Sequence, residues 1–146
     1  MKKQVINEMQ FSFVSKSENE SFARQTVCSF VAQVDPTMEE MSDIRIIVSE
    51  AVTNSIVHGY RGRLGIITVE VKLYSDNTTR IKIKDKGQGI ADLEKCMQPL
   101  YTTDPEGERG GMGLPIMKTL AKDFKISSAV DKGTVVVAIV ELGSTT

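Results

Sequence analysis

The pattern of apolar and polar positions predicts five strands. Met9, Phe11 and Phe13 alternate with polar residues near the N-terminus, which indicates a short strand with one buried face. Four longer segments are also predicted as strands: 66–74, 80–85, 125–130 and 134–141. Turn-forming residues separate segments 66–74 and 80–85, so these two strands are expected to pair as an antiparallel hairpin.

A period of three to four residues predicts helices between these strands. Ser17 and Glu20 have the spacing of a capping box, and the helix after them is expected to end near Val34. Its expected inward positions are Phe22, Thr26, Phe30 and Val31.

The longest predicted helix begins at a second capping box, Thr37 and Glu40, and continues to about His58. Gly59 follows at the position of a C-terminal cap. A three-four spacing marks the face expected to be buried: Met41, Ile44, Ile47, Val48, Ala51, Val52 and Ser55.

The order of elements predicts the fold class. A short helix at 92–97, a glycine-rich loop and a helix from Leu114 to about Phe124 lie between the two pairs of longer strands. Paired strands beside helices favour an α/β two-layer sandwich of the α+β type. We expect a single domain over residues 1–146, in which one mixed sheet carries its helices on one face.

Composition narrows the possible partners and location. The chain has 146 residues, which suits one core, and a net charge of -1 from 18 basic and 19 acidic residues. Because the charges are nearly balanced, the chain has no overall excess of positive charge that would attract nucleic acid or an anionic membrane. No apolar run approaches the ~20 residues that span a bilayer, and none follows the N-terminal lysines as in a signal peptide. A cytoplasmic location is therefore expected.

The first candidate motif lies on the longest helix. Glu50, Asn54 and His58 recur every four residues and so share one stripe beside the apolar face. An Asn oxygen is a suitable ligand for Mg²⁺, and a carboxylate one turn away could accept a proton. Taken alone, this spacing is better explained by solvated Glu50 and His58 side chains and an Asn54 that caps a local group, so the motif by itself is weak evidence.

The second motif, Asp85-Lys86-Gly87-Gln88-Gly89-Ile90, directly follows a predicted strand. A carboxylate at a strand end can accept a hydrogen bond from an exocyclic amine such as that of adenine. Glycines at 87 and 89 let the backbone approach a flat ring closely. An ordinary tight turn is the alternative interpretation.

The third motif, 109–115, joins a glycine-rich loop to a helix. Backbone N–H groups and the helix dipole make such a junction a phosphate site, and Arg109 could add a charged contact. A plain loop before a helix is the alternative. Neither the P-loop pattern nor the dinucleotide fingerprint is present.

The three motifs in this order resemble the GHKL ATPase superfamily, whose ATP-binding fold is also called the Bergerat fold. Gly133-Thr134 resembles the last motif of that superfamily. The chain is further similar to the anti-sigma F factor family of spore-forming bacteria, over most of the span from Met9 to Val140. The segments that carry this similarity are 20–24, 48–54, 58–60, 98–103 and 111–113.

The resemblance implies a homodimer that binds ATP and Mg²⁺, restrains sigma factor F and phosphorylates a serine of an anti-anti-sigma factor, leaving ADP. It makes Glu50 the general base, Asn54 the Mg²⁺ ligand and Asp85 the residue that reads adenine. The remaining pocket residues implied are Gly87, Gly89, Thr103, Arg109, Gly111, Gly113 and Thr134. It also implies that Glu20 and Arg24, on the first helix, bind the partner proteins.

Three other interpretations remain open. A sensor histidine kinase catalytic domain shares the fold, but the only histidine, His58, lies inside the nucleotide motif. An anti-sigma kinase of the general stress pathway would perform the same chemistry on other partners. A module that restrains a partner and uses ATP only as a structural ligand would bind nucleotide without catalysis.

Overall fold

The computed structural model describes residues 3–61, 63–90 and 113–143. In chain order, the N-terminal half contains β1 (Val5–Val14), α1 (Glu18–Val31), the 3-10 turn η1 (Ala32–Val34), α2 (Met38–Asn54) and the π-helical turn η2 (Ser55–Gly59). The C-terminal half contains β2 (Ile66–Tyr74), β3 (Thr78–Asp85), α4 (Gly113–Leu120), β4 (Asp123–Ala129) and β5 (Gly133–Glu141). The expected helix at 92–97 lies outside the described residues.

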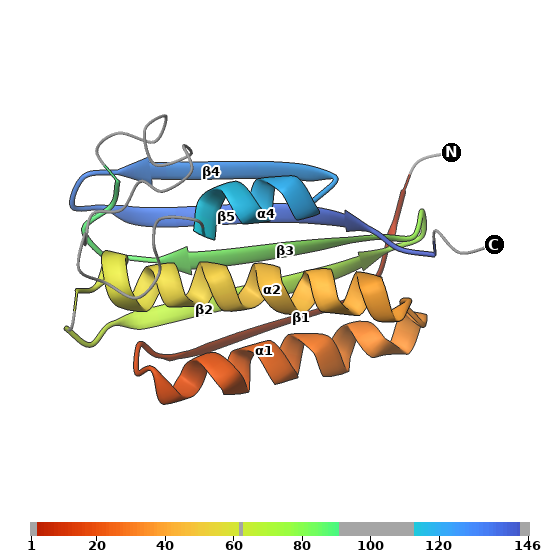
Figure 1. Ribbon diagram of the computed structural model, residues 1–146, viewed down its shortest axis with the longest axis horizontal. Coiled ribbons are helices and arrows are strands. Elements are labelled where there is room, and N and C mark those ends of the chain that lie inside the picture. Colours follow the sequence, from red (N-terminus) through yellow and green to blue (C-terminus); the bar gives the residue numbers. More distant parts are fainter. Residues whose placement is uncertain (1–2, 62, 91–112, 144–146) are drawn as a thin grey trace.

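The five strands form one sheet in the order β1-β2-β3-β5-β4 (Figure 1). Every neighbouring pair is antiparallel, so the expectation of a mixed sheet is wrong. Two antiparallel helices separate β1 from β2, so the chain reverses direction three times and β2 runs antiparallel to β1. The strands β3 and β4 run in the same direction, but β5 lies between them.

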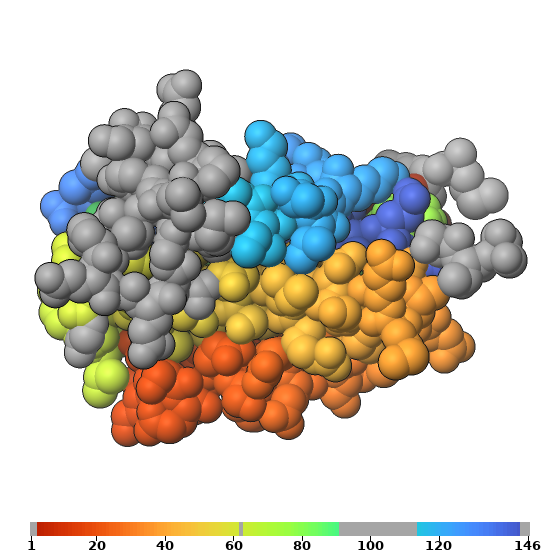
Figure 2. All heavy atoms as spheres, in the orientation of Figure 1, coloured from red at the N-terminus to blue at the C-terminus, as the bar shows by residue number. Residues whose placement is uncertain are grey.

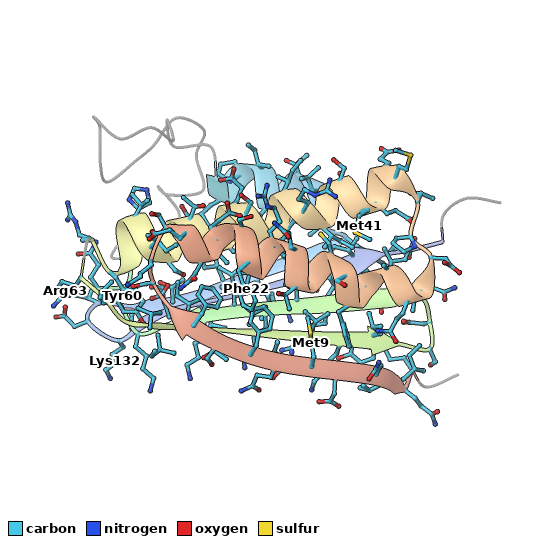
Figure 3. The ribbon with its side chains drawn as sticks, turned by 90° about the horizontal axis from the view of Figure 1, so that it is seen from below. Met9, Phe22, Met41, Tyr60, Arg63 and Lys132 are labelled. Carbon is cyan, nitrogen blue, oxygen red and sulfur yellow. The ribbon has the colours of Figure 1, made fainter. Side chains whose placement is uncertain are left out.

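The three helices α1, α2 and α4 cover one face of the sheet, with α2 between the other two (Figures 1 and 2). The expected two-layer sandwich is thereby confirmed. Alternate residues of β2 point into this layer: Ile67, Val69 and Val71 are fully buried. They meet the buried stripe of α2, which includes Ile44, Ile47, Val48 and Val52. The opposite face of the sheet carries no helix among the described residues (Figure 3).

The two predicted capping boxes have different outcomes. Thr37 Oγ1 accepts a hydrogen bond from the Glu40 N–H at 3.0 Å, and the Glu40 carboxylate accepts one from the Thr37 N–H at 2.8 Å. Ser17 caps nothing, because its backbone is already helical and its hydroxyl donates to the neighbouring Glu18 carboxylate at 3.1 Å. The box at Thr37 is confirmed and the box at Ser17 is wrong.

The inward face of α1 agrees with the expectation at Val31 and in part at Phe30, which packs against the core, but differs at Phe22. Ala23, Val27 and Val31 are fully buried, whereas Phe22 is 54% exposed and stacks edge-on against Phe11 of β1 at 5.9 Å. Small side chains let α1 lie close to α2 and the sheet, and the larger aromatic ring lies at the sheet edge.

The helix predicted from Leu114 is shorter than expected. The structure ends α4 at Leu120 and begins β4 at Asp123, so Phe124 lies in a strand. Phe124 is partly buried and packs against the core from there. An apolar residue at this position fits either period, and the pairing of β4 with β5 decides between them.

Candidate functional site

Asp85, the last residue of β3, lies at the centre of the candidate site. Its side chain is only 4% exposed. One carboxylate oxygen accepts a hydrogen bond from the Ser55 hydroxyl at 2.7 Å, and the other accepts one from the Gly87 N–H at 2.9 Å. Two hydrogen bonds from separate elements therefore fix the position and orientation of this carboxylate.

The glycines around Asp85 are required by close approach of the protein's own backbone. A Cβ atom on Gly87 would lie 2.2 Å from the carbonyl oxygen of Gly59. Another on Gly59 would lie 3.1 Å from the Asp85 carboxylate. The end of the long helix is thereby packed directly against the loop that follows β3. Gly59 has no left-handed backbone, so its role is this contact and not the expected cap.

Gly89 and Gly133 combine close contact with a left-handed backbone. Their φ angles are 76° and 98°, a region that favours glycine. A Cβ on Gly89 would meet the Ala129 carbonyl oxygen at 2.1 Å, and one on Gly133 would meet the Asp85 carbonyl oxygen at the same distance. The second motif is therefore fitted closely to the turn between β4 and β5.

The Tyr60 hydroxyl connects the loop after β3 to the start of β2 through two hydrogen bonds. It accepts a hydrogen bond from the Lys86 N–H at 2.8 Å and donates one to the Ile66 carbonyl at 2.6 Å. Gln88 adds a second tie, because its side-chain amide donates to the His58 carbonyl at 2.8 Å. The loop after β3 is thus hydrogen-bonded directly to η2 through Gln88, and the Tyr60 hydroxyl links it to the start of β2.

Glu50 and Asn54 lie one turn apart at the C-terminal end of α2. Asn54 directly precedes Ser55, whose hydroxyl contacts Asp85, so the first and second motifs meet in space. Within the described residues no group of three or more His, Cys, Asp or Glu side chains forms a metal cluster. A single Asn oxygen still suits Mg²⁺, which takes most of its remaining ligands from phosphates and water.

Thr134 lies beside Asp85 on the neighbouring strand. The two residues are directly paired in the β3–β5 register. The Thr134 and Ser128 hydroxyls are 2.9 Å apart, and Ser128 also accepts the Ile90 N–H at 2.7 Å. The last predicted motif is therefore joined to the second one.

The other predicted residues fall into two groups. Gly113 is the first residue of α4, while Thr103, Arg109 and Gly111 lie outside the described residues. Glu20 and Arg24 lie one turn apart on α1, at 3.5 Å between the Arg24 Nε and a Glu20 carboxylate oxygen. They lie on α1, whereas Asp85 is the last residue of β3.

Sequence reasoning missed Ser55 and Tyr60 as site residues. Ser55 was assigned to the apolar stripe of the helix, and its burial agrees with that. Its hydroxyl, however, contacts a residue thirty positions later. A polar residue inside an otherwise apolar stripe was the available signal, because a buried hydroxyl requires a hydrogen-bond partner.

Comparisons with known proteins identify relatives of this chain. Residues 13–140 match the family of histidine kinase-like ATPase domains. A protein of Thermoanaerobacter sp. (strain X514) named anti-sigma F factor is 50% identical over 138 residues, which is 94% of this chain and 96% of the relative. Anti-sigma F factors of Clostridium acetobutylicum and Geobacillus kaustophilus are 46% and 50% identical, and each alignment covers about nine-tenths of both chains.

Solved structures with the same fold are more distant in sequence. The structure of the RsbU and RsbW domains of Rv1364c from Mycobacterium tuberculosis superposes with a TM-score of 0.70 at 20% identity. It covers 93% of this chain, which spans about a third of that protein. The mycobacterial sensor histidine kinase MprB gives a TM-score of 0.52 at 12% identity. In the part of the chain that the structure describes, none of the helices is long and apolar enough to cross a membrane.

Proposed function

This chain belongs to the anti-sigma F factor family of histidine kinase-like ATPase domains, and from that premise we propose a switchable anti-sigma factor. It would bind Mg-ATP, restrain sigma factor F in the cytoplasm, and phosphorylate a serine of an anti-anti-sigma factor. The relatives' shared name favours sigma factor F over a general-stress sigma factor as the partner.

The buried Asp85 carboxylate is the observation that carries the nucleotide part of the proposal. It is fixed by Ser55 and Gly87. An ionised carboxylate accepts hydrogen bonds and cannot donate them. Adenine presents an exocyclic amine as a donor, so the group matches this nucleobase. Asn54 offers the amide oxygen for Mg²⁺. We assign contacts with the phosphates to Thr103, Arg109, Gly111 and Gly113, as the resemblance implies.

Bound ATP would supply the phosphoryl group, and Mg²⁺ would neutralise part of the negative charge on the phosphates. The protein would supply position. We assign to Glu50, one turn before Asn54 on a well-capped helix, the acceptance of the proton from the substrate serine hydroxyl. Because α2 is buried along one face, Glu50 and Asn54 would keep a fixed separation during the reaction.

Partner recognition would use another part of the molecule. Glu20 and Arg24 lie together on α1, and we propose that sigma factor and antagonist compete for this surface. Among the described strands β1 is at an edge of the sheet, which suits pairing with a second copy across a two-fold axis. We therefore propose a homodimer joined at β1.

The kinase step is tested with Glu50→Gln, which keeps the shape of the side chain and removes its charge. The variant and the wild type are incubated with labelled ATP and a purified anti-anti-sigma factor encoded in the same genome. We expect phosphoserine formation to fall by at least about 100-fold, on the order of a lost general base. ATP affinity measured by calorimetry should stay within about threefold, as for a group that acts only in the transition state.

A matched control is Glu39→Gln, an exposed glutamate in the first turn of the same helix, which should leave both quantities unchanged. Equal phosphorylation by wild type and Glu50→Gln would remove the base role. Wild-type protein that binds ATP and the sigma factor without any phosphorylation would support the non-catalytic module instead.

A further inference from the structure

The open face of the sheet carries a row of three lysines. Ile81 and Ile83 of β3 point into the core, at 1% and 3% exposure, so the strand's alternation turns Lys82 and Lys84 to the other face. Lys86 continues the row just beyond the strand. Among the described residues none of these lysines forms an ion pair.

The lysines border a hollow of about 610 Å³. We call it the lysine hollow, and it is lined by Gln10, Tyr60, Gly65, Ile66, Thr68, Glu70, Lys82, Lys84 and Lys86. The strand residues that line it point to the face of the sheet opposite the helices (Figure 3), whereas Arg24 of the proposed partner surface lies on α1.

An exposed apolar patch adjoins the lysine hollow. Ile66 is 52% exposed and is paired in register with Val14, which is 37% exposed. Leu64, two residues before Ile66, is 65% exposed. Contiguous apolar side chains beside charged ones are typical of surfaces that bind other proteins.

The charges around the hollow also indicate the kind of occupant. Glu70 lies inside it and is held by Arg80 at 3.1 Å and Lys72 at 3.8 Å. With a net charge of -1 the chain has no overall positive field to attract the dense negative charge of a nucleic acid. A protein segment with spaced carboxylates and apolar side chains matches both the separate lysines and the apolar patch beside them.

We propose that the lysine hollow and the patch formed by Val14, Leu64 and Ile66 dock an extended acidic segment of a partner protein. Alternate residues of a strand are about 6.7 Å apart. The lysine row therefore matches carboxylates placed at every second residue of an extended chain. The apolar side chains of that segment would contact Ile66 and its neighbours. This docking site does not depend on the kinase reaction.

The test uses the full chain and fluorescent synthetic peptides, with fluorescence anisotropy as the measurement. One peptide alternates Glu with Val and Thr, and a second has the same composition with its glutamates in one block. A single-stranded oligonucleotide of equal charge is the third probe. We expect the alternating peptide to bind most tightly, because only its carboxylates follow the lysine spacing.

Variants then locate the site. Lys84→Gln with Lys86→Gln should weaken binding of the alternating peptide about tenfold, as for two charge contacts. The matched control, Lys16→Gln with Lys118→Gln, removes two exposed lysines outside the hollow and should leave affinity unchanged. Ile66→Thr, which keeps a β-branched residue in the strand, should weaken binding about threefold.

Several results overturn the proposal. They are no binding of the alternating peptide, equal binding of the blocked peptide, or the same loss in the control pair. Tighter binding of the oligonucleotide that is also sensitive to Lys84→Gln with Lys86→Gln would assign the hollow to nucleic acid instead.

Discussion

Asp85 shows how much of the candidate site depends on single hydrogen bonds between distant residues. Its carboxylate is buried, and Ser55 supplies one of its two partners from the helical turn that follows Asn54. The same hydroxyl joins the end of α2 to the end of β3. Ser55 is therefore expected to position the carboxylate without contacting nucleotide itself.

Ser55→Ala should weaken ATP binding about tenfold, because one carboxylate oxygen loses its partner and the side chain can rotate. The free energy of unfolding should fall by about 1–3 kcal/mol, the cost of leaving a buried acceptor unsatisfied. Calorimetry and urea unfolding measure the two effects. Ser42→Ala, on the same helix but away from Asp85, is the control, and equal ATP affinity in the two variants would contradict the positioning role.

Sequence patterns could predict the residues of the local motifs but not those that join the motifs. Asp85, Gly87 and Gly89 follow a strand within five positions, so their order alone indicates a strand-end site. Ser55 and Tyr60 act through partners 30 and 26 residues away. A serine or a tyrosine on a helix has many ordinary roles, and only the fold places these two against Asp85 and Lys86.

The two predicted capping boxes provide a matched test of helix starts. Thr37→Ala removes the acceptor of the Glu40 N–H and should lower the free energy of unfolding by about 1 kcal/mol. Ser17→Ala removes a hydroxyl that caps no backbone group and should change it by less than about 0.5 kcal/mol. Urea unfolding of both variants is the measurement. Equal losses of unfolding free energy would mean that the cap at Thr37 does not stabilise the helix.

Near the start of α2, three carboxylates lie close enough to affect stability as pH changes. Partial burial, with Glu39 and Glu40 nearby, raises the pKa of Asp43 above its ordinary value. The native state then holds this proton more tightly than the unfolded chain does. The contribution of Asp43 to stability is therefore favourable in acid and is lost as pH rises through its folded pKa.

Asp43→Asn should consequently stabilise the protein at pH 7 by a small amount, on the order of 0.3 kcal/mol after solvent screening. The gain should shrink as pH falls below about 4, where the wild-type carboxyl is protonated in both states. Asp123→Asn, an exposed aspartate on β4, is the control. A gain that grows with acidity would have the wrong sign and contradict the raised pKa.

Periodicity predicts the buried face of a helix best where the apolar positions allow only one assignment of that face. The stripe of α2 is buried as expected from Ile44 to Val52, because that helix lies between two others. In α1 the large residues Phe22 and Phe30 suggest the inward face, but the fully buried positions are the smaller Ala23 and Val27, while Phe30 is only partly buried against the core and Phe22 is exposed. Size alone does not reveal how closely two helices approach, since that distance is set by the neighbour.

The direction of the strands could not be derived from the order of elements. The order of elements, with two helices between β1 and β2 and one helix before β4, is compatible with a mixed sheet and with an antiparallel sheet. The insertion of β5 between β3 and β4 decides the outcome. It also brings Thr134 beside Asp85, so the topology that was mispredicted is the feature that completes the candidate site.

Because segments from α2, β3 and β5 meet at Asp85, nucleotide binding should stabilise the fold as a unit. ATP at 100 times its dissociation constant should raise the free energy of unfolding by about 2.7 kcal/mol. For a chain of this size that corresponds to a rise of roughly 8 °C in Tm. The measurement is thermal unfolding with Mg²⁺ present throughout.

GTP at the same concentration should give little or no rise, because guanine carries a carbonyl oxygen where adenine carries its amine, and two acceptors repel. In Asp85→Asn the rise with ATP should also disappear. In the wild type both carboxylate oxygens accept hydrogen bonds, whereas an Asn amide has a single acceptor oxygen, so the variant has one acceptor fewer to offer the adenine amine. An equal rise with GTP and ATP in the wild type would show that Asp85 does not read the base, and the site would then recognise only the phosphates.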